Sequence, residues 1–317
     1  MTASRTPRIA AIGKASWHRL LVVDSYPARG GCAIVQAEHS QPGGTVSTAV
    51  ALARLGAEVS FAGIVGNDAE GAALRAFLDA EGIDSGWLAV RQGQPTDTST
   101  IITGGGSPDR TVLWRPGAHI VRGDRLDIAA AFDHDVVFLD MADAPLRRFL
   151  TDLPAHTLPR TRLVGSLSDL VNAGLPDALE VAMRHDVLLG AERDVEALAD
   201  AATLDEAVAT IQSKMRGSNL RSLVVFRGAR GCRICLPGEM WDIPGFPVAR
   251  QAGATADTAF TAGTIYGVAR RWPWPEVGRF ANAAEVLSIQ ALDSHDRLPT
   301  LDEVRTFLEH HPTGTAP

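Results

Sequence analysis

The feature that most restricts how this chain can fold is the repeated alternation of a short apolar run with a longer helical pattern. The clearest apolar runs are Arg8–Gly13, Glu58–Val65, Val136–Leu139, Leu163–Val164, Val187–Leu189 and Leu223–Phe226. Helical patterns occupy Ala49–Gly56, Ala69–Gly82, Ala197–Lys214, Thr258–Arg271, Pro275–Gln290 and Leu301–Leu308. Short buried strands that alternate with helices are typical of a parallel sheet covered on both faces. The sequence therefore predicts an α/β fold.

Two pairs of predicted strands break this alternation, because no helix separates their members. Leu20–Val23 and Cys32–Val35 flank a turn at Tyr26–Gly31, and Thr98–Thr103 and Thr111–Trp114 flank the turn Gly104-Gly105-Gly106-Ser107. Strands joined by turns form antiparallel hairpins. We expect the two pairs to form a small flap outside the main sheet.

Charge and hydropathy exclude several classes of partner. The 317 residues include 30 Lys and Arg against 37 Asp and Glu, a formal net charge of −7, and no basic tract interrupts this balance. This argues against nucleic acid or an anionic membrane as the main partner. No apolar run approaches the roughly 18 residues of a membrane span. Because Met1–Arg8 also lacks the apolar core of a secretion signal, we expect a cytoplasmic protein.

The basic residues are almost all arginine. Only Lys14 and Lys214 are lysines, so an anion bound by a side chain is expected to meet a guanidinium. The cysteines are few: Cys32 stands alone, and Cys232 and Cys235 form a CxxC spacing inside a predicted strand, turn and strand. With no second CxxC or nearby His for zinc, we interpret them as reduced structural thiols.

Three segments rich in small residues are candidates for ligand contact. Gly43-Gly44 precedes a helix and could line a hydroxyl or anion site, although a plain loop before the helix is the simpler interpretation of the glycines alone. Gly228-Ala229-Arg230-Gly231 follows a strand and could hold a nucleotide or be a hairpin turn. Neither a GxxxxGK[ST] loop nor a strand-linked GxGxxG is present, so the common nucleotide motifs are missing.

The third segment is Gly253–Thr258, which leads into the helical pattern and contains Asp257. Small residues before a helix can turn consecutive N–H groups toward an anion. An aspartate there can accept a proton from a hydroxyl during phosphoryl transfer. From the residues alone, an Asp that caps the helix is the simpler interpretation.

Taken in order, these segments resemble the ribokinase-like (PfkB) family of carbohydrate and nucleoside kinases, from about Ile9 to Gln290. The matching stretches are Ile12-Gly13, Val23–Pro27, Pro42–Gly44, Ala49–Gly56, Ala62–Gly71, Gly117-Ala118, Gly228–Gly231 and Asp257–Gly263. The resemblance implies one domain over residues 1–317, a three-layer α/β/α sandwich with a mostly parallel central sheet. It also implies a β-strand lid over the sugar, formed by strands around 15–40 and 96–116, which often dimerises.

The resemblance implies a reaction and a set of roles. In the family, the γ-phosphoryl group of ATP moves to a hydroxyl of the substrate, with Mg²⁺ bound to ATP. Asp257 would be the catalytic base, and the backbone of Ala254, Thr255 and Ala256 the anion hole. The remaining implied positions are Ser16, His18, Gly43, Gly44 and Thr48 for the substrate, Phe226, Gly228, Arg230 and Gly231 for the nucleotide, and Asp194 for the metal.

Several positions depart from the family pattern. The stretch Gln251–Asp257 stands where the family usually has D-T-x-G-A-G-D. Ala256 would cost about 1 kcal/mol or more if that position needs a positive φ. Gln251 replaces an acidic residue associated with a monovalent cation, which removes the basis for predicting a potassium requirement.

Other departures fall on the substrate and metal positions. His18 replaces an Asp that grips sugar hydroxyls, with Ser16 two residues before it, and Thr48 replaces an Asn. The N-x-x-E element falls on Ala191–Asp194, where Glu192 could substitute for the missing Glu. His18 could pair with an anionic substrate when protonated, or be a lid residue beside Trp17.

We therefore expect an ATP-dependent kinase that phosphorylates a hydroxyl of a sugar, sugar-like or nucleoside substrate, and that forms a homodimer through its lid. The alternative is a catalytically silent member of the same fold that binds a ligand or regulates.

Overall fold

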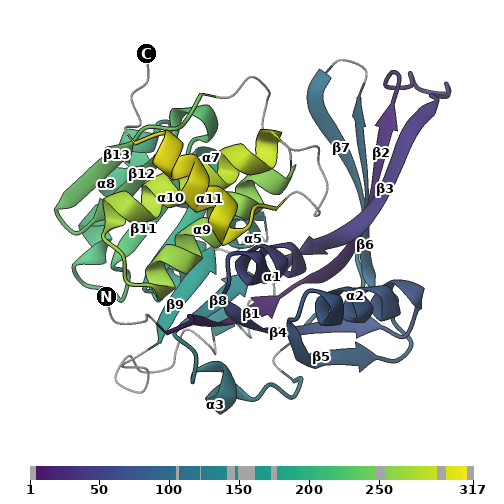
Figure 1. The fold of residues 1–317 in the computed structure, drawn as a ribbon, viewed down its shortest axis with the longest axis horizontal. Helices are drawn as coiled ribbons and strands as arrows, with labels where there is room; N and C mark the ends of the chain where they lie inside the picture. Colours follow the sequence, from purple (N-terminus) through teal and green to yellow (C-terminus); the bar gives the residue numbers. More distant parts are fainter. Residues whose placement is uncertain are drawn as a thin grey trace.

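The computed structural model describes residues 5–104, 107–121, 123–140, 147–148, 161–172, 177–247, 254–290 and 298–312. A nine-stranded sheet forms its centre, in the order β13-β12-β11-β10-β9-β8-β1-β4-β5 (Figure 1). Its strands are β1 Arg8–Gly13, β4 Glu58–Gly66, β5 Asp84–Arg91, β8 Val136–Asp140, β9 Arg162–Ser166, β10 Val187–Ala191, β11 Ser222–Phe226, β12 Cys232–Leu236 and β13 Glu239–Ile243. All neighbours are parallel except at the β11-β12-β13 edge. The predicted α/β sandwich with a mostly parallel sheet is confirmed.

Helices cover both faces of this sheet. They are α1 Thr45–Arg54, α2 Ala69–Ala80, α3 Ile128–Ala131, α5 Ser168–Asn172, α6 Ala178–Ala182, α7 Glu192–Ala199, α8 Leu204–Met215, α9 Ala254–Ala269, α10 Trp274–Gln290 and α11 Leu301–His310. Alternate residues of β11 enter different cores: Val224 packs with Phe260 of α9, whereas Leu223 packs with Ile211 of α8. This alternation gives each strand two buried faces, which explains its uniformly apolar sequence.

The two predicted strand pairs join into a separate four-stranded sheet, which we call the lid sheet. Its order is β3-β2-β6-β7, with β2 Ala15–Val23, β3 Val35–Gly44, β6 Asp97–Gly104 and β7 Ser107–Arg115. The pairs meet through parallel β2 and β6, where Ser16 is opposite Asp97. Figure 1 shows this sheet projecting beside the central one. Residues 105–106 of the predicted glycine turn lie outside the described residues.

Three boundaries differ from the sequence prediction. The strand expected at Cys32–Val35 begins at Val35 and continues through Gly44, because its ladder with β2 extends to the two glycines. The first helix begins at Thr45 rather than Ala49, directly after Gly44 turns the chain with a φ of 64°. The helix expected over Ala197–Lys214 is two helices, because Asp200 adopts a left-handed conformation with a φ of 50°.

The CxxC cysteines lie on β12 and enter different cores. Cys232 packs with the α9 and α10 side, and Cys235 packs with the α7 and α8 side. Burial raises the pKa of each thiol to about 12. Residues three apart on a strand face opposite ways, so these thiols cannot share a metal and are structural, as predicted.

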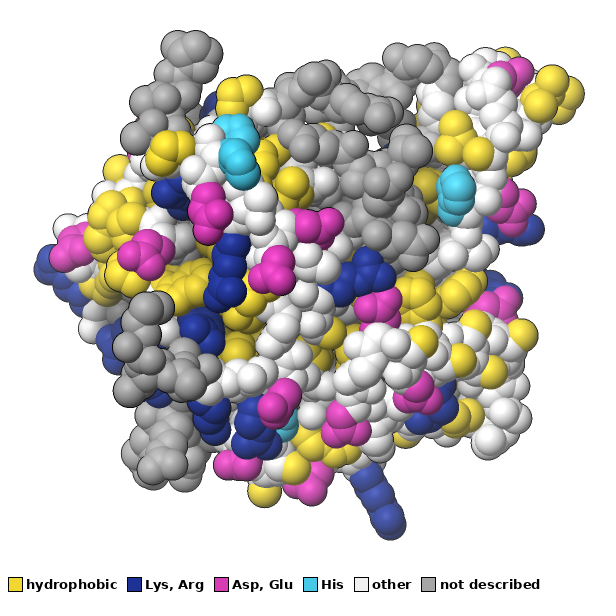
Figure 2. Space-filling view, viewed as in Figure 1, with side chains coloured by type: hydrophobic (Ala, Val, Ile, Leu, Met, Phe, Trp, Pro, Cys, Tyr) yellow, Lys and Arg dark blue, Asp and Glu magenta, His cyan; other side chains and the backbone are white. Residues whose placement is uncertain are grey.

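No helix within the described residues is long and apolar enough to cross a membrane. On the face in Figure 2, Lys and Arg side chains alternate with Asp and Glu and form no continuous basic surface among the residues shown in colour.

Candidate active site

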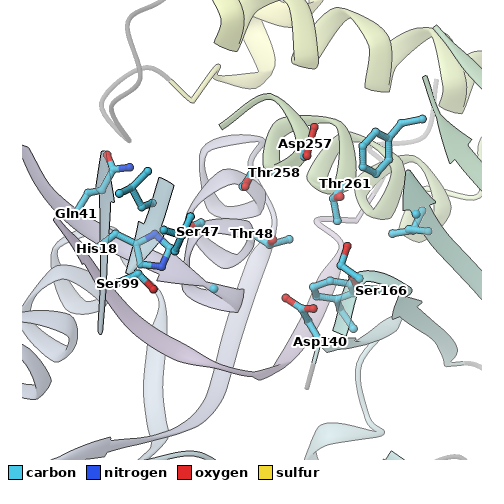
Figure 3. A pocket seen from close by; sticks show the side chains of 18 of the residues that line it. His18, Gln41, Ser47, Thr48, Ser99, Asp140, Ser166, Asp257, Thr258 and Thr261 are labelled. Carbon is cyan, nitrogen blue, oxygen red and sulfur yellow. The ribbon is translucent and has the colours of Figure 1, made fainter. Parts of the chain in front are cut away.

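A cavity of about 340 Å³ lies where the lid sheet faces the carboxyl ends of the central strands (Figure 3). Its lining comes from the lid sheet, α1, the ends of β8 to β11 and the first turns of α9. The lining residues are His18, Gln41, Gly44, Ser47, Thr48, Ser99, Ile101, Arg110, Val112, Phe138, Asp140, Ser166, Ser168, Leu189, Gly190, Phe226, Asp257, Thr258 and Thr261. Parallel α/β sheets bind ligands at this edge, so the cavity is the candidate active site.

The lid side of the cavity is formed where β3 ends and α1 begins. The His18 ring lies on Gly43, where a Cβ would approach the ring to 2.1 Å. Gly44 lines the cavity with a φ of 64°, and a Cβ there would lie 2.7 Å from the Lys14 carbonyl oxygen. Both glycines are therefore required by close approach to other groups of the protein, and only Gly44 is among the residues that line the cavity.

The His18 imidazole is neutral at physiological pH. Burial, with a smaller contribution from the positive charge of Lys14, lowers its pKa to about 4. In the cavity without a ligand, the protonated form of His18 that an anionic substrate would pair with is disfavoured, because it would place a poorly solvated charge in the cavity wall. A neutral ring can still donate or accept one hydrogen bond with a sugar hydroxyl.

Ser16, the other substrate position predicted on β2, does not line the cavity. Its fully buried hydroxyl donates to Asp97 at 2.7 Å. The same carboxylate accepts from the Trp114 indole at 2.7 Å and pairs with Lys14 at 3.2 Å, and the Lys14 ammonium lies 4.5 Å from the centre of the Trp114 ring. This network ties β2, β6 and β7 together behind the cavity, so Ser16 contributes to the lid structure.

Asp257 lies in the first turn of α9 and is among the residues that line the cavity (Figure 3). Burial raises the pKa of its carboxyl group, the nearby charges of Arg110 and Arg193 oppose this rise, and the charge of Asp194 adds to it. A raised pKa makes a carboxylate a better proton acceptor once it is ionised. Thr258 and Thr261 extend the same wall of the cavity along α9.

The backbone of Ala254, Thr255 and Ala256 forms the start of α9. The first four N–H groups of a helix have no intrahelical acceptor, and the positive end of the helix dipole lies there. Ala256 is helical and fully buried, and it is not among the described residues with a positive φ. The strain considered for a Cβ at this position is therefore absent. Gln251 lies outside the described residues.

A second carboxyl group lies behind Asp257. Glu285 of α10 is 3% exposed, and its Oε1 has no hydrogen-bond partner among the described residues. Burial, with the charge of Asp257 adding to it, raises the pKa of Glu285 to about 8. Glu285 is therefore neutral at pH 7, which leaves Asp257 as the carboxylate that ionises first.

The nucleotide positions lie at the end of β11. Phe226 lines the cavity and packs against Phe260, with 5.5 Å between ring centres. Gly228–Arg230 forms a short 3-10 turn that leads into β12, so the hairpin interpretation of this segment is correct. The Arg230 guanidinium pairs with Glu192, at the start of α7. Of the four predicted nucleotide positions, Phe226 lines the cavity, and Gly228, Arg230 and Gly231 are not among its lining residues.

The predicted metal residue, Asp194, acts as a helix cap in this structure. Its Oδ2 accepts from the Ser168 hydroxyl at 3.1 Å and from the Ala191 N–H at 3.4 Å. No group of three or more His, Cys, Asp or Glu side chains among the described residues could hold a metal ion. A magnesium ion that accompanies ATP needs only one or two carboxylates, and Asp194 is close enough to influence the Asp257 charge.

Sequence reasoning missed several polar residues of the cavity, among them Gln41, Ser47, Ser99, Arg110, Asp140 and Ser166. Asp140 could have been found, because it directly follows the apolar run of β8 at its carboxyl end. Its Oδ2 accepts from the Thr45 hydroxyl at 3.2 Å, which joins β8 to the first residue of α1.

The fold and the cavity under the lid sheet have the architecture of ribokinase-like small-molecule kinases. The family model of the pfkB family carbohydrate kinases matches residues 6–301. The chain therefore belongs to the pfkB family of carbohydrate kinases, as the sequence motifs predicted.

Individual relatives agree with this assignment. A ribokinase from Haemophilus influenzae is 26% identical over 83% of this chain and 85% of its own length. A ribokinase from Bacillus subtilis is 25% identical over 95% of this chain and 99% of its own length. Among solved structures, Arabidopsis thaliana ribokinase, complexed with ribose and ATP, has a TM-score of 0.81 at 18% identity, covering 96% of this chain and 99% of that one. Thermotoga maritima ribokinase has a TM-score of 0.79 at 20% identity, with the same coverage.

Proposed function

We propose that this protein transfers the γ-phosphoryl group of ATP to a hydroxyl of a sugar, a sugar-like molecule or a nucleoside held under the lid sheet. The observation that carries this proposal is the position of Asp257, in the cavity and in the first turn of α9. Its carboxylate would accept the proton of the attacking hydroxyl. The N–H groups of Ala254–Ala256 would stabilise the charge on the transferred phosphoryl oxygens.

Mg²⁺ would enter with ATP and neutralise phosphate charge. Asp194 would hold it, directly or through water, with Glu192 beside it on the same turn. The base of ATP would lie against Phe226 and the turn at Gly228–Gly231. These assignments are supported by two residues that line the cavity: Ser168, whose hydroxyl donates to Asp194, and Phe226, which the turn at Gly228–Arg230 follows.

The polar lining favours a substrate with several hydroxyl groups. Neutral His18 and the Gln41 and Ser99 side chains can exchange hydrogen bonds with hydroxyls. Arg110 is the cation on the lid side, and it has no ion-pair partner within the described part of the chain. Its guanidinium would contact the phosphoryl group during transfer, or an acidic group of the substrate.

An ATP-consumption assay over a panel of sugars, nucleosides and sugar phosphates tests this proposal. We expect turnover with at least one compound in the wild type, lost in the isosteric Asp257→Asn variant. If no compound is turned over, or if the variant equals the wild type on every one, the proposal fails.

The catalytically silent alternative is favoured by one observation, the engagement of Asp194 in capping α7. A carboxylate held by Ser168 and a backbone N–H is less available to a metal. This alternative predicts sugar or nucleoside binding without turnover, and weak binding of ATP–Mg²⁺. Calorimetric titration separates the two, because micromolar ATP–Mg²⁺ binding contradicts the silent alternative.

We also propose that the protein is a homodimer joined through the lid sheet. Its edge strands expose apolar side chains: Val35 of β3 is 48% exposed, and Val112 and Leu113 of β7 are 48% and 58% exposed. Exposed apolar edge strands favour pairing.

Light scattering should show a dimer that Leu113→Glu converts to monomer. Met240→Glu is the matched control, because Met240 is 49% exposed on the edge strand β13 of the other sheet. A monomeric wild type contradicts the proposal.

A further inference from the structure

A second cavity, of about 280 Å³, lies at the amino ends of the central strands, opposite the carboxyl ends that form the candidate active site. Its floor is the first residue of three neighbouring strands: Arg162 of β9, Val187 of β10 and Ser222 of β11. Its roof is the end of α9 and the start of α10, with Val268, Arg271, Trp272 and Trp274. None of the residues that line it lines the candidate active site.

The charge of this second cavity is strongly one-sided for an acidic protein. Arg162, Arg221 and Arg271 line it against a single carboxylate, Asp186. Asp186 is already engaged, since it accepts from the Leu163 N–H at 2.9 Å and from Arg162 at 3.3 Å. Arg221 and Arg271 have no ion-pair partner among the residues that the structure describes. The cavity therefore offers uncompensated guanidinium groups to an anion.

A buried hydroxyl at the floor of the cavity lacks a partner. Ser222 is fully buried, lines the cavity, and its Oγ has no hydrogen bond within the described ranges. Buried polar groups are almost always satisfied by protein, water or ligand. A ligand oxygen inside the cavity would accept the hydrogen bond that this hydroxyl can donate.

The rest of the wall is apolar and aromatic. Trp272 is held in place by Tyr266 and Phe280, with ring centres 5.6 Å and 5.1 Å away, and Val187, Leu236 and Val277 complete the surface. A fixed indole beside guanidinium groups suits a molecule with a ring at one end and an anionic group at the other. The size of the cavity limits that molecule to a small metabolite.

The backbone at Arg271 supports a role for its side chain. Arg271 follows α9 with a φ of 57°, and its N–H donates to the Val268 carbonyl at 3.0 Å. Glycine is the residue that this left-handed position at a helix end favours. Arginine at this position is conformationally strained, and its side chain adds a positive charge to the cavity lining.

We propose that this cavity is a second binding site, for a monophosphorylated sugar or nucleoside whose phosphate contacts Arg221 and Arg271 and whose ring lies against Trp272 and Trp274. The phosphate ester on a sugar ring is the shared chemistry of the two classes of ligand. Nothing in this inference depends on turnover at Asp257.

The test is calorimetric titration of the full chain with AMP and with ribose 5-phosphate, with inorganic phosphate and adenosine as partial probes. AMP binding alone would identify a nucleotide site, and binding of both would identify a sugar phosphate site. Tryptophan fluorescence gives an independent readout, and Trp274→Phe should remove part of the change.

Arg271→Gly is the decisive variant, because it removes the guanidinium while relieving the left-handed backbone. We expect a melting temperature at or above that of the wild type and a loss of affinity of about tenfold or more, since a hydrogen bond to a charged group is lost. Arg221→Gln should behave similarly. Arg305→Gln on α11 is the matched control, because Arg305 lines neither cavity, and it should leave the affinity unchanged. The proposal is overturned if neither phosphate ester binds saturably at millimolar concentration, or if Arg271→Gly binds as tightly as Arg305→Gln.

Discussion

The two edges of the central sheet are built from the same strands yet carry opposite chemistry. At the carboxyl edge, β9 and β11 end at Ser166 and Phe226, and α9 contributes Asp257. At the amino edge, the same strands begin at Arg162 and Ser222, and α9 is followed by Arg271. The carboxyl edge combines hydroxyls with buried carboxyl groups, whereas the amino edge combines guanidinium groups with indoles. One sheet and one helix therefore position two sets of side chains that share no residue.

The largest effect is expected from Asp257→Asn at the carboxyl edge. Loss of the proton acceptor should lower kcat by roughly 10²–10⁴-fold on any substrate found in the panel. Because its pKa is raised, wild-type activity should increase with pH above the ordinary range of an aspartate. With no ligand at the carboxyl edge, phosphate ester binding at the amino edge should not change, and if it does, the two cavities are not separate sites.

Gly43→Ala should have the next largest effect, because the new Cβ would occupy the position of the His18 ring. Displacement of a substrate-facing group by about 1 Å can cost up to about 100-fold in activity. We expect substrate affinity to fall while ATP–Mg²⁺ affinity is kept, measured by calorimetry. Gly82→Ala is a control for an added Cβ, since nothing lies within 4 Å of that position, although its φ of 69° costs some stability. Equal substrate affinity in Gly43→Ala and the wild type would contradict the role of His18.

Arg110→Gln should lower kcat/KM by about tenfold, because a guanidinium that contacts an anionic group is lost. Arg193→Gln is the matched control, since Arg193 also acts on the charge of Asp257 but is absent from the cavity lining. If kcat/KM falls equally for a substrate that has no acidic group, Arg110 acts on the transferred phosphoryl group. No effect on any substrate would remove Arg110 from the site.

The smallest effect is expected on the thermal stability of the protein, when Glu285 behind Asp257 is changed. The pKa of Glu285 is raised from 4.5 to about 8 in the folded chain. The contribution of its neutral form to stability is therefore full below about pH 4.5 and is lost as the pH rises through about 8. Glu285→Gln should leave the melting temperature unchanged near pH 4.5 and raise it by a few degrees at pH 8.5. A gain that does not depend on pH would show that the carboxyl group is not buried as described.

The sequence predicted the central sheet well and the lid sheet less well, for a physical reason. Strands such as Val136–Asp140 are buried on both faces, so their apolar runs stand out. β3 is exposed along Val35–Ser40, and its extent is fixed by pairing with β2, which local sequence does not show. Strand β5, whose residues are half exposed, was not predicted at all.

The candidate site was predictable where a motif fixes it and not where packing does. Asp257, Thr48 and Phe226 were placed by resemblance, and all three line the cavity. Ser16 was placed by the same resemblance but faces Asp97, because its orientation depends on a partner 81 residues away in the chain. The neutral state of His18 depends on burial and on Lys14, which spacing along the chain cannot reveal.

Helix α9 connects the two cavities. It runs for 16 residues, about 24 Å, with Asp257 in its first turn and Val268 in its last. Because the helix is continuous between the two cavities, a ligand that shifted its last turn would also shift its first turn. Occupancy of one cavity and affinity in the other would then be thermodynamically linked, and the linkage would act equally in both directions.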